Sequence, residues 1–179
     1  MIDINRKIVL CFSSYSCTGK TKTVNLINEQ YRGFYNVVFD KQKWLLSGYE
    51  RTRDNALIKE IVLDLFEDVC KRNLPIILMS PMTTEETYLR HKKIADDNGY
   101  EMYFISLTAP REVLIQRFRE RVESAKLKES KTIAQTDEGI FLETLDRGFY
   151  TPADALIIDT SVNSPEEVVA QVLKYAQIA

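Results

Sequence analysis

The sequence lacks any apolar run long enough to cross a lipid bilayer. Its apolar runs, such as residues 8–12 and 75–79, are far too short, because a membrane-spanning helix needs about 20 apolar residues. The first seven residues also lack the long apolar stretch of a signal peptide. We therefore expect a protein without a membrane partner.

Cysteine is scarce, and neither sign of charge is in large excess. The three cysteines, Cys11, Cys17 and Cys70, are an odd set without the spacing of metal ligands. We therefore expect a cytoplasmic location and no disulfide framework. The formal net charge of −2 gives no support for a protein that coats nucleic acid or a membrane surface.

The rest of the composition is that of an ordinary globular chain. Hydrophobic residues make up 45% and charged residues 28% of the 179 residues, a length that suits one domain with a sizeable core. We predict a single domain over residues 1–179, and the oligomeric state is left open.

Short apolar segments alternate along the chain with longer amphipathic ones. The expected strands and helices are strands at 7–13, 36–40, 75–80, 100–108 and 155–159, and helices at 20–31, at 54–72 and from about 83, 110 and 164. This alternation predicts an α/β fold, with a five-stranded parallel sheet and helices on both of its faces.

Finer local patterns predict a buried helix face and two helix starts. Capping-box patterns place one helix start at Thr83 with Glu86 and another at Ser164 with Glu167. The helix at 54–72 is expected to bury an apolar stripe that recurs every fourth residue, namely Leu57, Ile61, Leu65 and Val69.

Glycine is missing where a phosphate-binding loop usually has it. The segment "SSYSCTGKT" at 13–21 joins the first expected strand to the first expected helix, which is the setting that such a loop requires. Gly19, Lys20 and Thr21 supply the closing glycine, the phosphate-binding lysine and a hydroxyl for Mg²⁺. Ser14 replaces the first glycine of the pattern. The alternative is a chance Gly-Lys-Thr at a helix start.

Cys17 is the second departure in this loop. A non-glycine residue with left-handed backbone costs roughly 1–2 kcal/mol, which weakens nucleotide binding by about tenfold without abolishing it. Because Cys17 lies just before a helix N-terminus, we expect the pKa of its thiol to be lowered.

Four segments in order resemble the small P-loop kinases of the nucleoside-kinase, adenylylsulfate-kinase and polynucleotide-kinase type. They are the loop at 13–21, "VVFDKQKW", "LTAPREVLIQRFRERV" and "YTPADALIIDTSVNSPEEVVAQVL". The resemblance covers nearly the whole chain and includes a degenerate Walker A loop. It implies a three-layer α/β sandwich that uses ATP and Mg²⁺, with a mobile lid around 117–139.

The resemblance also implies roles for individual residues. Lys20 would bind the phosphates, Thr21 would ligate Mg²⁺, and Asp40 would act as the base or as a metal ligand. Arg117 and Arg121 would close over the nucleotide. The implied nucleotide-binding set is Ser14, Tyr15, Ser16, Cys17, Thr18, Gly19, Lys20, Thr21 and Arg117.

Each of these roles has a plainer alternative. Asp40 could be a turn residue at the end of a strand, and Arg117 with Arg121 could form a solvated helix face. Lys43, implied to bind the acceptor with Asp40, stands where the family often has arginine and cannot form a bidentate fork. Ser80 stands where many P-loop proteins have an acid for Mg²⁺.

Two further segments receive a structural interpretation. His91 lies in a run of basic residues and is expected on a solvated helix face. A basic and aromatic stretch follows Asp40, and a packed lid helix is favoured over an acceptor pocket. This stretch contains Lys41, Lys43, Trp44, Tyr49, Arg51 and Arg53.

The sequence thus predicts an ATP-dependent phosphotransferase that moves the γ-phosphoryl group to a hydroxyl or phosphate of a small acceptor. The acceptor stays open: a nucleoside, a nucleotide, a metabolite or a polynucleotide end, the last being the one role for nucleic acid. The alternative is a non-catalytic or weakly hydrolytic nucleotide-binding protein with a decayed kinase site.

Overall fold

The fold is built around a five-stranded parallel sheet, seen in a computed structural model that describes residues 2–3, 6–127 and 137–178. The strands run in the order β4 (Tyr35–Val38), β5 (Ile76–Met79), β2 (Ile8–Phe12), β6 (Glu101–Thr108) and β7 (Leu156–Asp159), and every neighbouring pair is parallel. The short strands β1 (Ile2–Asp3) and β3 (Tyr31–Arg32) form a separate parallel pair. The predicted five-stranded parallel sheet is confirmed.

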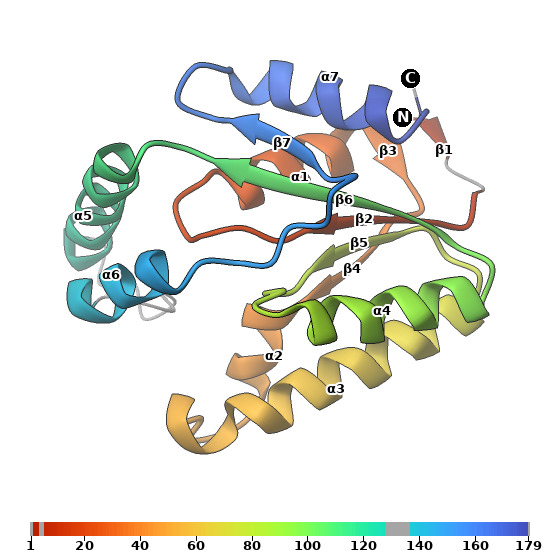
Figure 1. Ribbon diagram of the computed structural model, residues 1–179, viewed down its shortest axis with the longest axis horizontal. Coiled ribbons are helices and arrows are strands. Elements are labelled where there is room, and N and C mark those ends of the chain that lie inside the picture. The colour runs from red at the N-terminus through yellow and green to blue at the C-terminus, as the bar shows by residue number, and fades with distance from the viewer. Residues whose placement is uncertain (1, 4–5, 128–136, 179) are drawn as a thin grey trace.

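Helices cover both faces of this sheet (Figure 1). On one face, α1 (Lys20–Gln30) and α7 (Pro165–Tyr175) pack against Ile8, Leu10 and Phe12 of β2. On the other face, α3 (Arg51–Lys71) and α4 (Glu85–Asp97) pack with Val9 and Cys11 of the same strand. Successive side chains of a strand point to opposite faces. All five residues of β2 are therefore buried, and the strand reads as a continuous apolar run.

Two further helices lie beyond the carboxyl ends of the strands (Figure 1). They are α5 (Arg111–Leu127) and α6 (Glu138–Arg147), joined by a small core that includes the stacked rings of Phe118 and Phe141, 4.4 Å apart. The expected lid at 117–139 comprises the end of α5 and the start of α6, and its residues 128–136 lie outside the described ranges. Its mobility stays a prediction.

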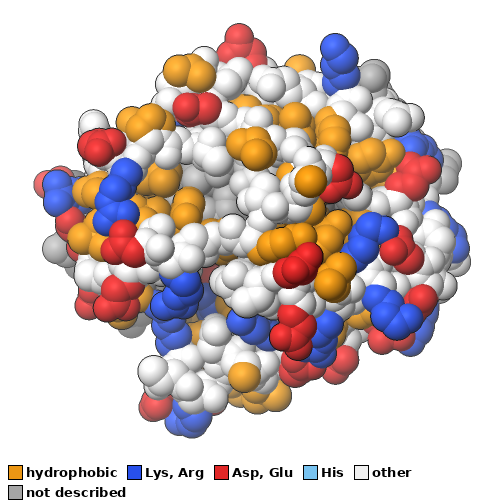
Figure 2. Space-filling view, viewed as in Figure 1, with side chains coloured by type: hydrophobic (Ala, Val, Ile, Leu, Met, Phe, Trp, Pro, Cys, Tyr) orange, Lys and Arg blue, Asp and Glu red, His pale blue; other side chains and the backbone are white. Residues whose placement is uncertain are grey.

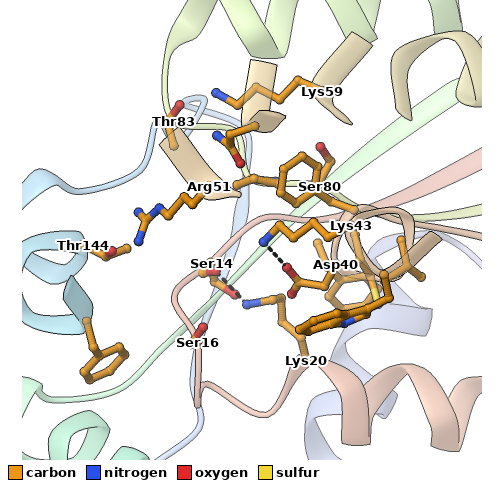
Figure 3. A pocket seen from close by; sticks show the side chains of 18 of the residues that line it. Ser14, Ser16, Lys20, Asp40, Lys43, Arg51, Lys59, Ser80, Thr83 and Thr144 are labelled. Carbon is orange, nitrogen blue, oxygen red and sulfur yellow. Dashed lines mark hydrogen bonds and ion pairs between the residues drawn. The ribbon is translucent and has the colours of Figure 1, made fainter. Parts of the chain in front are cut away.

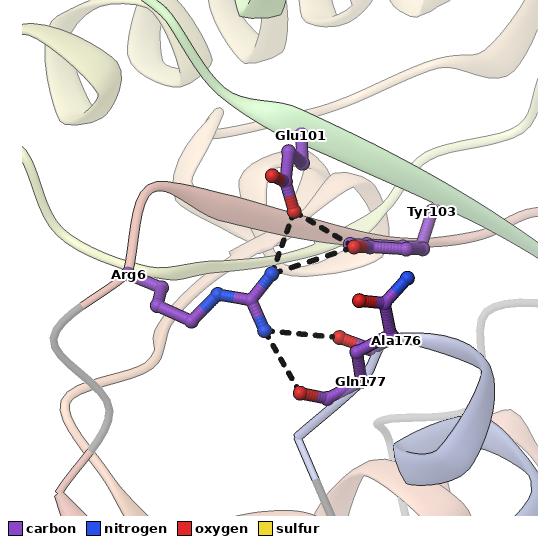
Figure 4. Close-up of polar contacts among 5 residues, drawn as sticks. All are labelled: Arg6, Glu101, Tyr103, Ala176 and Gln177. Carbon is purple, nitrogen blue, oxygen red and sulfur yellow. Dashed lines mark hydrogen bonds and ion pairs between the residues drawn. The ribbon is translucent and has the colours of Figure 1, made fainter.

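The opposite end of the sheet is closed by a polar cluster around Arg6 (Figure 4). The Arg6 guanidinium lies 2.6 Å from the Glu101 carboxylate at the start of β6. It also donates to the backbone carbonyls of Ala176 and Gln177, just after α7, at 3.3 and 2.9 Å. This cluster ties the entry of β2 to β6 and to the end of the chain.

The predicted buried stripe of α3 is wrong at Leu57 and Ile61 and correct at Val69, which is 2% exposed. Leu57 and Ile61 are 51% and 39% exposed, whereas Ile58 and Val62 are fully buried against the sheet. Both registers of the helix present an apolar side chain every fourth residue, so periodicity alone does not distinguish them. Contact with the sheet selects the second register.

The expectation for His91 is also wrong. Its side chain is 4% exposed, it packs against Phe66 of α3, and its Nδ1 lies 2.8 Å from the carbonyl of Thr87. His91 shares the buried face of α4 with Tyr88 and Ala95, which the neighbouring basic residues hid in the sequence.

The helix-start signals are confirmed at one site and shifted at the other. Ser164 and Glu167 form a reciprocal capping box at α7. The cap of α4 is Thr84 instead of Thr83, and its hydroxyl accepts from the backbone N–H of Thr87. Within the described ranges, no helix has the length and apolar character to cross a membrane.

The corrected register of α3 makes a testable prediction. Ile58→Ala should lower the free energy of unfolding by about 2–5 kcal/mol, because it opens a cavity against the sheet. Leu57→Ala, one position away, should change it by less than about 1 kcal/mol because half of that side chain is already in water. Urea unfolding of both variants measures the difference, and equal losses would contradict the register.

Candidate functional site

The loop at 13–19 leaves the carboxyl end of β2, the central strand of the sheet, and leads directly into α1. Open parallel sheets place their ligands beside such strand ends. The Ser13 hydroxyl accepts from the backbone N–H of Met82 at 2.9 Å. Ser14 and Thr18 hydroxyls lie 3.1 Å apart, and Thr18 donates to the Tyr15 carbonyl at 2.9 Å. Side-chain hydrogen bonds therefore hold this loop where other loops rely on glycine.

Two loop residues have left-handed backbone conformations. Gly19 has φ +92°, and Cys17 has φ +67°. Cys17 is thus a non-glycine residue at a position where glycine would be favoured. Ser14 does not have a positive φ, so replacing the first glycine of the pattern does not itself impose this strain.

The expected lowering of the Cys17 thiol pKa is wrong. Burial of Cys17 raises the pKa of its thiol, and this effect outweighs the nearby cations Arg121, Lys20 and Arg117, which act in the opposite direction. The thiol packs beside the small core that joins α5 and α6. The residues that remove water from this thiol are far from Cys17 in the chain, so the local sequence does not predict the effect.

Lys20 is folded back onto the loop (Figure 3). Its ammonium group donates to the carbonyls of Ser14 and Tyr15 at 2.6 and 2.5 Å. Burial lowers the pKa of Lys20 to about 8, and the Asp40 carboxylate partly opposes this shift. The lysine is therefore next to the loop that is predicted to hold phosphates, and its charge is sensitive to mildly alkaline pH.

Asp40 lies in the first turn of α2 (Phe39–Leu45), because β4 ends at Val38, two residues earlier than expected. The predicted placement at a strand end is wrong, and a carboxylate in the first turn of a helix is electrostatically favourable. The Asp40 side chain is 62% exposed and lies 2.6 Å from the Lys43 ammonium. Figure 3 shows Asp40, Lys43 and Lys20 grouped together.

Arg117 is a structural bridge instead of part of a solvated face. Its guanidinium donates to the hydroxyl and carbonyl of Thr160 at 2.9 and 2.8 Å, and to the Cys17 carbonyl at 3.4 Å. It thereby joins α5 to the loop and to the segment after β7. Arg121 lies 5.4 Å over the Phe118 ring and is near enough to influence the pKa of Lys20.

The loop, α2, α3 and α6 together line a cavity of about 270 Å³. In the space-filling view, Lys and Arg side chains gather at this hollow (Figure 2). The polar and charged lining residues are Ser14, Ser16, Lys20, Asp40, Lys43, Arg51, Asn55, Lys59, Ser80, Thr83, Thr144 and Arg147.

The stretch after Asp40 both packs and lines this cavity, because Tyr49 also packs against the core on the α3 face of the sheet. Trp44 is 52% exposed and lines the cavity with Lys43, Tyr49 and Arg51. Arg53 instead pairs with Asp54 at 2.7 Å.

The cavity includes several residues that sequence reasoning missed and leaves out seven of the twelve predicted site residues, namely Tyr15, Cys17, Thr18, Gly19, Thr21, Arg117 and Arg121. Thr21 is exposed in the first turn of α1 and is not among the described residues that line it. The structure adds Lys59, Thr144 and Arg147. The four-residue spacing of Asn55 and Lys59 places both on one face of the predicted helix and could have indicated Lys59. No local pattern indicated Thr144 or Arg147 of α6. In the described part of the chain, no group of three His, Cys, Asp or Glu residues could hold a metal ion.

Comparison with known proteins identifies the fold. No protein-family model and no curated protein matches the sequence. The structure is similar to an APS kinase from Mycobacterium tuberculosis in complex with AMPPNP and APS (13% identity, 97% and 99% of the two chains covered, TM-score 0.65). It is also similar to a gluconokinase from Sinorhizobium meliloti (15%, 98% and 95%, TM-score 0.68). A third match is a tunicamycin resistance protein of Deinococcus radiodurans (17%, 97% and 98%, TM-score 0.65). The fold is that of P-loop kinases, as the resemblance implied.

The pKa of Lys20 predicts how MgATP affinity depends on pH. Below pH 8 the ammonium is charged and attracts phosphates, and above its pKa of about 8 the free protein loses this charge. Affinity should therefore fall by about tenfold or more between pH 8 and 9.5. Calorimetric titration measures it, and Lys20→Arg, which stays charged, should show a flat profile. An equal fall in both proteins would assign the effect to another group.

Proposed function

We propose that the protein transfers the γ-phosphoryl group of ATP to a hydroxyl or phosphate of a small acceptor, with Mg²⁺. The observation that supports this proposal is the convergence of Lys20 and Asp40 on one small cavity at the carboxyl end of the central strand. The solved kinases with the same fold raise its plausibility. The chemical class of the acceptor is inferred from the side chains that line the cavity.

The loop would hold the phosphates of ATP. Its backbone N–H groups precede the N-terminus of α1, where the helix dipole favours anions. A phosphate near Lys20 would replace the carbonyls of Ser14 and Tyr15, which now accept its hydrogen bonds. Arg117 would keep the loop in place through the Cys17 carbonyl, and Arg121 would add positive charge beside it.

The residues present fit a magnesium ion bound largely through the nucleotide. Mg²⁺ in such sites takes oxygen ligands, usually one or two carboxylates with phosphates and water. The Thr21 hydroxyl and the Asp40 carboxylate are the candidate ligands from this chain, and Ser80 supplies no charge at the end of β5. The ion would neutralise charge on the phosphates.

Asp40 would accept the proton of the acceptor hydroxyl or orient that hydroxyl. Its carboxylate lines the cavity beside Lys20 and is held by Lys43 at 2.6 Å. Groups within reach of the reacting oxygen act by positioning and by proton transfer. Lys43 orients the carboxylate and balances its charge.

A second candidate is a nucleotide-binding protein without transfer activity. The strained Cys17 backbone and the neutral Ser80 favour it. The intact Lys20, the carboxylate of Asp40 and a defined cavity favour the transferase. Nucleotide binding is common to both candidates, and acceptor phosphorylation separates them.

MgATP should stabilise the folded protein. At a hundredfold excess over Kd, the gain is about 2.7 kcal/mol, which is a melting shift of about 5–10 °C for a chain of this size. Thermal unfolding with and without MgATP measures the shift, and Lys20→Ala should lose it. The absence of any shift with millimolar MgATP, ADP or GTP would refute nucleotide binding.

Asp40→Asn separates the roles of the carboxylate. If Asp40 is the base, transfer should fall by roughly 10²–10⁴-fold while ATP affinity changes little. If Asp40 ligates Mg²⁺ instead, MgATP affinity should fall and Ser80→Asp should partly restore it. Measuring ATP affinity and acceptor phosphorylation on the same variant distinguishes these roles. Unchanged transfer would remove Asp40 from the site.

A further inference from the structure

The cavity beside Asp40 is strongly cationic. Asp40 is the one carboxylate among its described lining residues. A hollow lined mainly by one sign of charge concentrates ligands of the opposite sign. The cations that line it come from four segments of the chain, namely Lys20, Lys43, Arg51, Lys59 and Arg147.

Most of these cations are not balanced by the protein. Within the described residues, Arg51, Lys59 and Arg147 take part in none of the ion pairs. At the other end of α3, by contrast, Lys71 and Arg72 each pair with a carboxylate four residues earlier, at 2.7 and 3.0 Å. The same helix thus neutralises its cations away from the cavity and leaves them unbalanced inside it.

Two of the three unbalanced cations, Arg51 and Lys59, lie on α3, and the third, Arg147, is at the end of α6. Arg51, Asn55 and Lys59 are spaced by four residues and share one face of α3, and all three line the cavity. Figure 3 places Lys59 and Thr83 at the opposite end of the labelled group from Lys20. This α3 wall of the cavity is therefore separate from the lysine that would hold ATP.

We propose that Arg51, Lys59 and Arg147 bind a carboxylate or phosphate group of the acceptor, which is thus a small hydroxylated anion. The inference rests on the proposed function. Guanidinium groups match both anions with paired hydrogen bonds. The cavity of about 270 Å³ lies just below the usual range of ligand pockets, about 300–1,000 Å³, which favours a small acceptor. The Thr83 hydroxyl is available to the acceptor's own hydroxyls, and the Thr144 hydroxyl, which donates to the Ile140 carbonyl at 2.9 Å, can still accept a hydrogen bond.

The test compares matched pairs of compounds that differ in one anionic group. Glucose with gluconate, ribose with ribose 5-phosphate, and nucleosides with their monophosphates are titrated calorimetrically into the nucleotide-free protein. An anionic member should bind at least about tenfold more tightly than its neutral partner, the effect expected of a charge-assisted hydrogen bond. The carboxylate and phosphate pairs show which of the two groups is preferred.

Substitutions show which side chains produce the preference for the anionic compound. Arg51→Gln and Lys59→Gln should each weaken binding of the anionic compound by about ten- to hundredfold, and the control Lys71→Gln on the same helix should not. Lys20→Ala should retain the preference, because the anion lies on the other wall. The proposal is overturned if no anionic member is preferred, if the preference survives in Arg51→Gln and Lys59→Gln, or if it disappears in Lys20→Ala.

Failure of the anion site can be distinguished from failure of the proposed function. An anion that binds to the α3 wall while MgATP produces no melting shift refutes phosphoryl transfer and leaves the anion site intact. A protein that binds MgATP and phosphorylates only neutral acceptors, with unchanged KM in Lys59→Gln, refutes the anion site and leaves the transferase.

Discussion

Complete burial of β2 between two layers of helices determines where the rest of the site lies. This strand pairs with β5 on one side and β6 on the other, and its side chains enter both cores. It cannot shift without breaking two ladders and unpacking both faces. The backbone N–H of Ser13 continues the pairing by donating to the Ile105 carbonyl at 3.1 Å. The loop therefore begins at a fixed point, and α1 begins directly after it.

The loop keeps its shape through contacts that partly replace glycine. The hydroxyls of Ser14 and Thr18 bond across it, and Arg117 holds the Cys17 carbonyl from outside. These contacts help to offset the left-handed backbone of Cys17, which costs about 1–2 kcal/mol. The arrangement also half-buries Lys20, whose hydrogen bonds to loop carbonyls stabilise a charge that burial disfavours.

Local sequence signals predicted the architecture and part of the loop. Alternating apolar and amphipathic segments predicted the parallel sheet, and the Ser164 capping box predicted the start of α7 to the residue. The glycine argument pointed to Cys17, where φ is positive. The roles of Lys20 in binding phosphates and of Asp40 in transfer stay predictions.

The sequence by itself determined the five strands of the sheet and the helices α1, α3, α4, α5 and α7, because these choices depend on residues within one or two turns of each other. It did not delimit α2 or indicate α6. Only the tertiary structure decided which face of α3 is buried, that His91 lies in the core, and that burial raises the pKa of the Cys17 thiol. It also decided that Lys59 and Arg147 line one cavity. Burial, desolvation and the meeting of charges depend on side chains that are far apart in the chain, and only packing against the sheet brings them together.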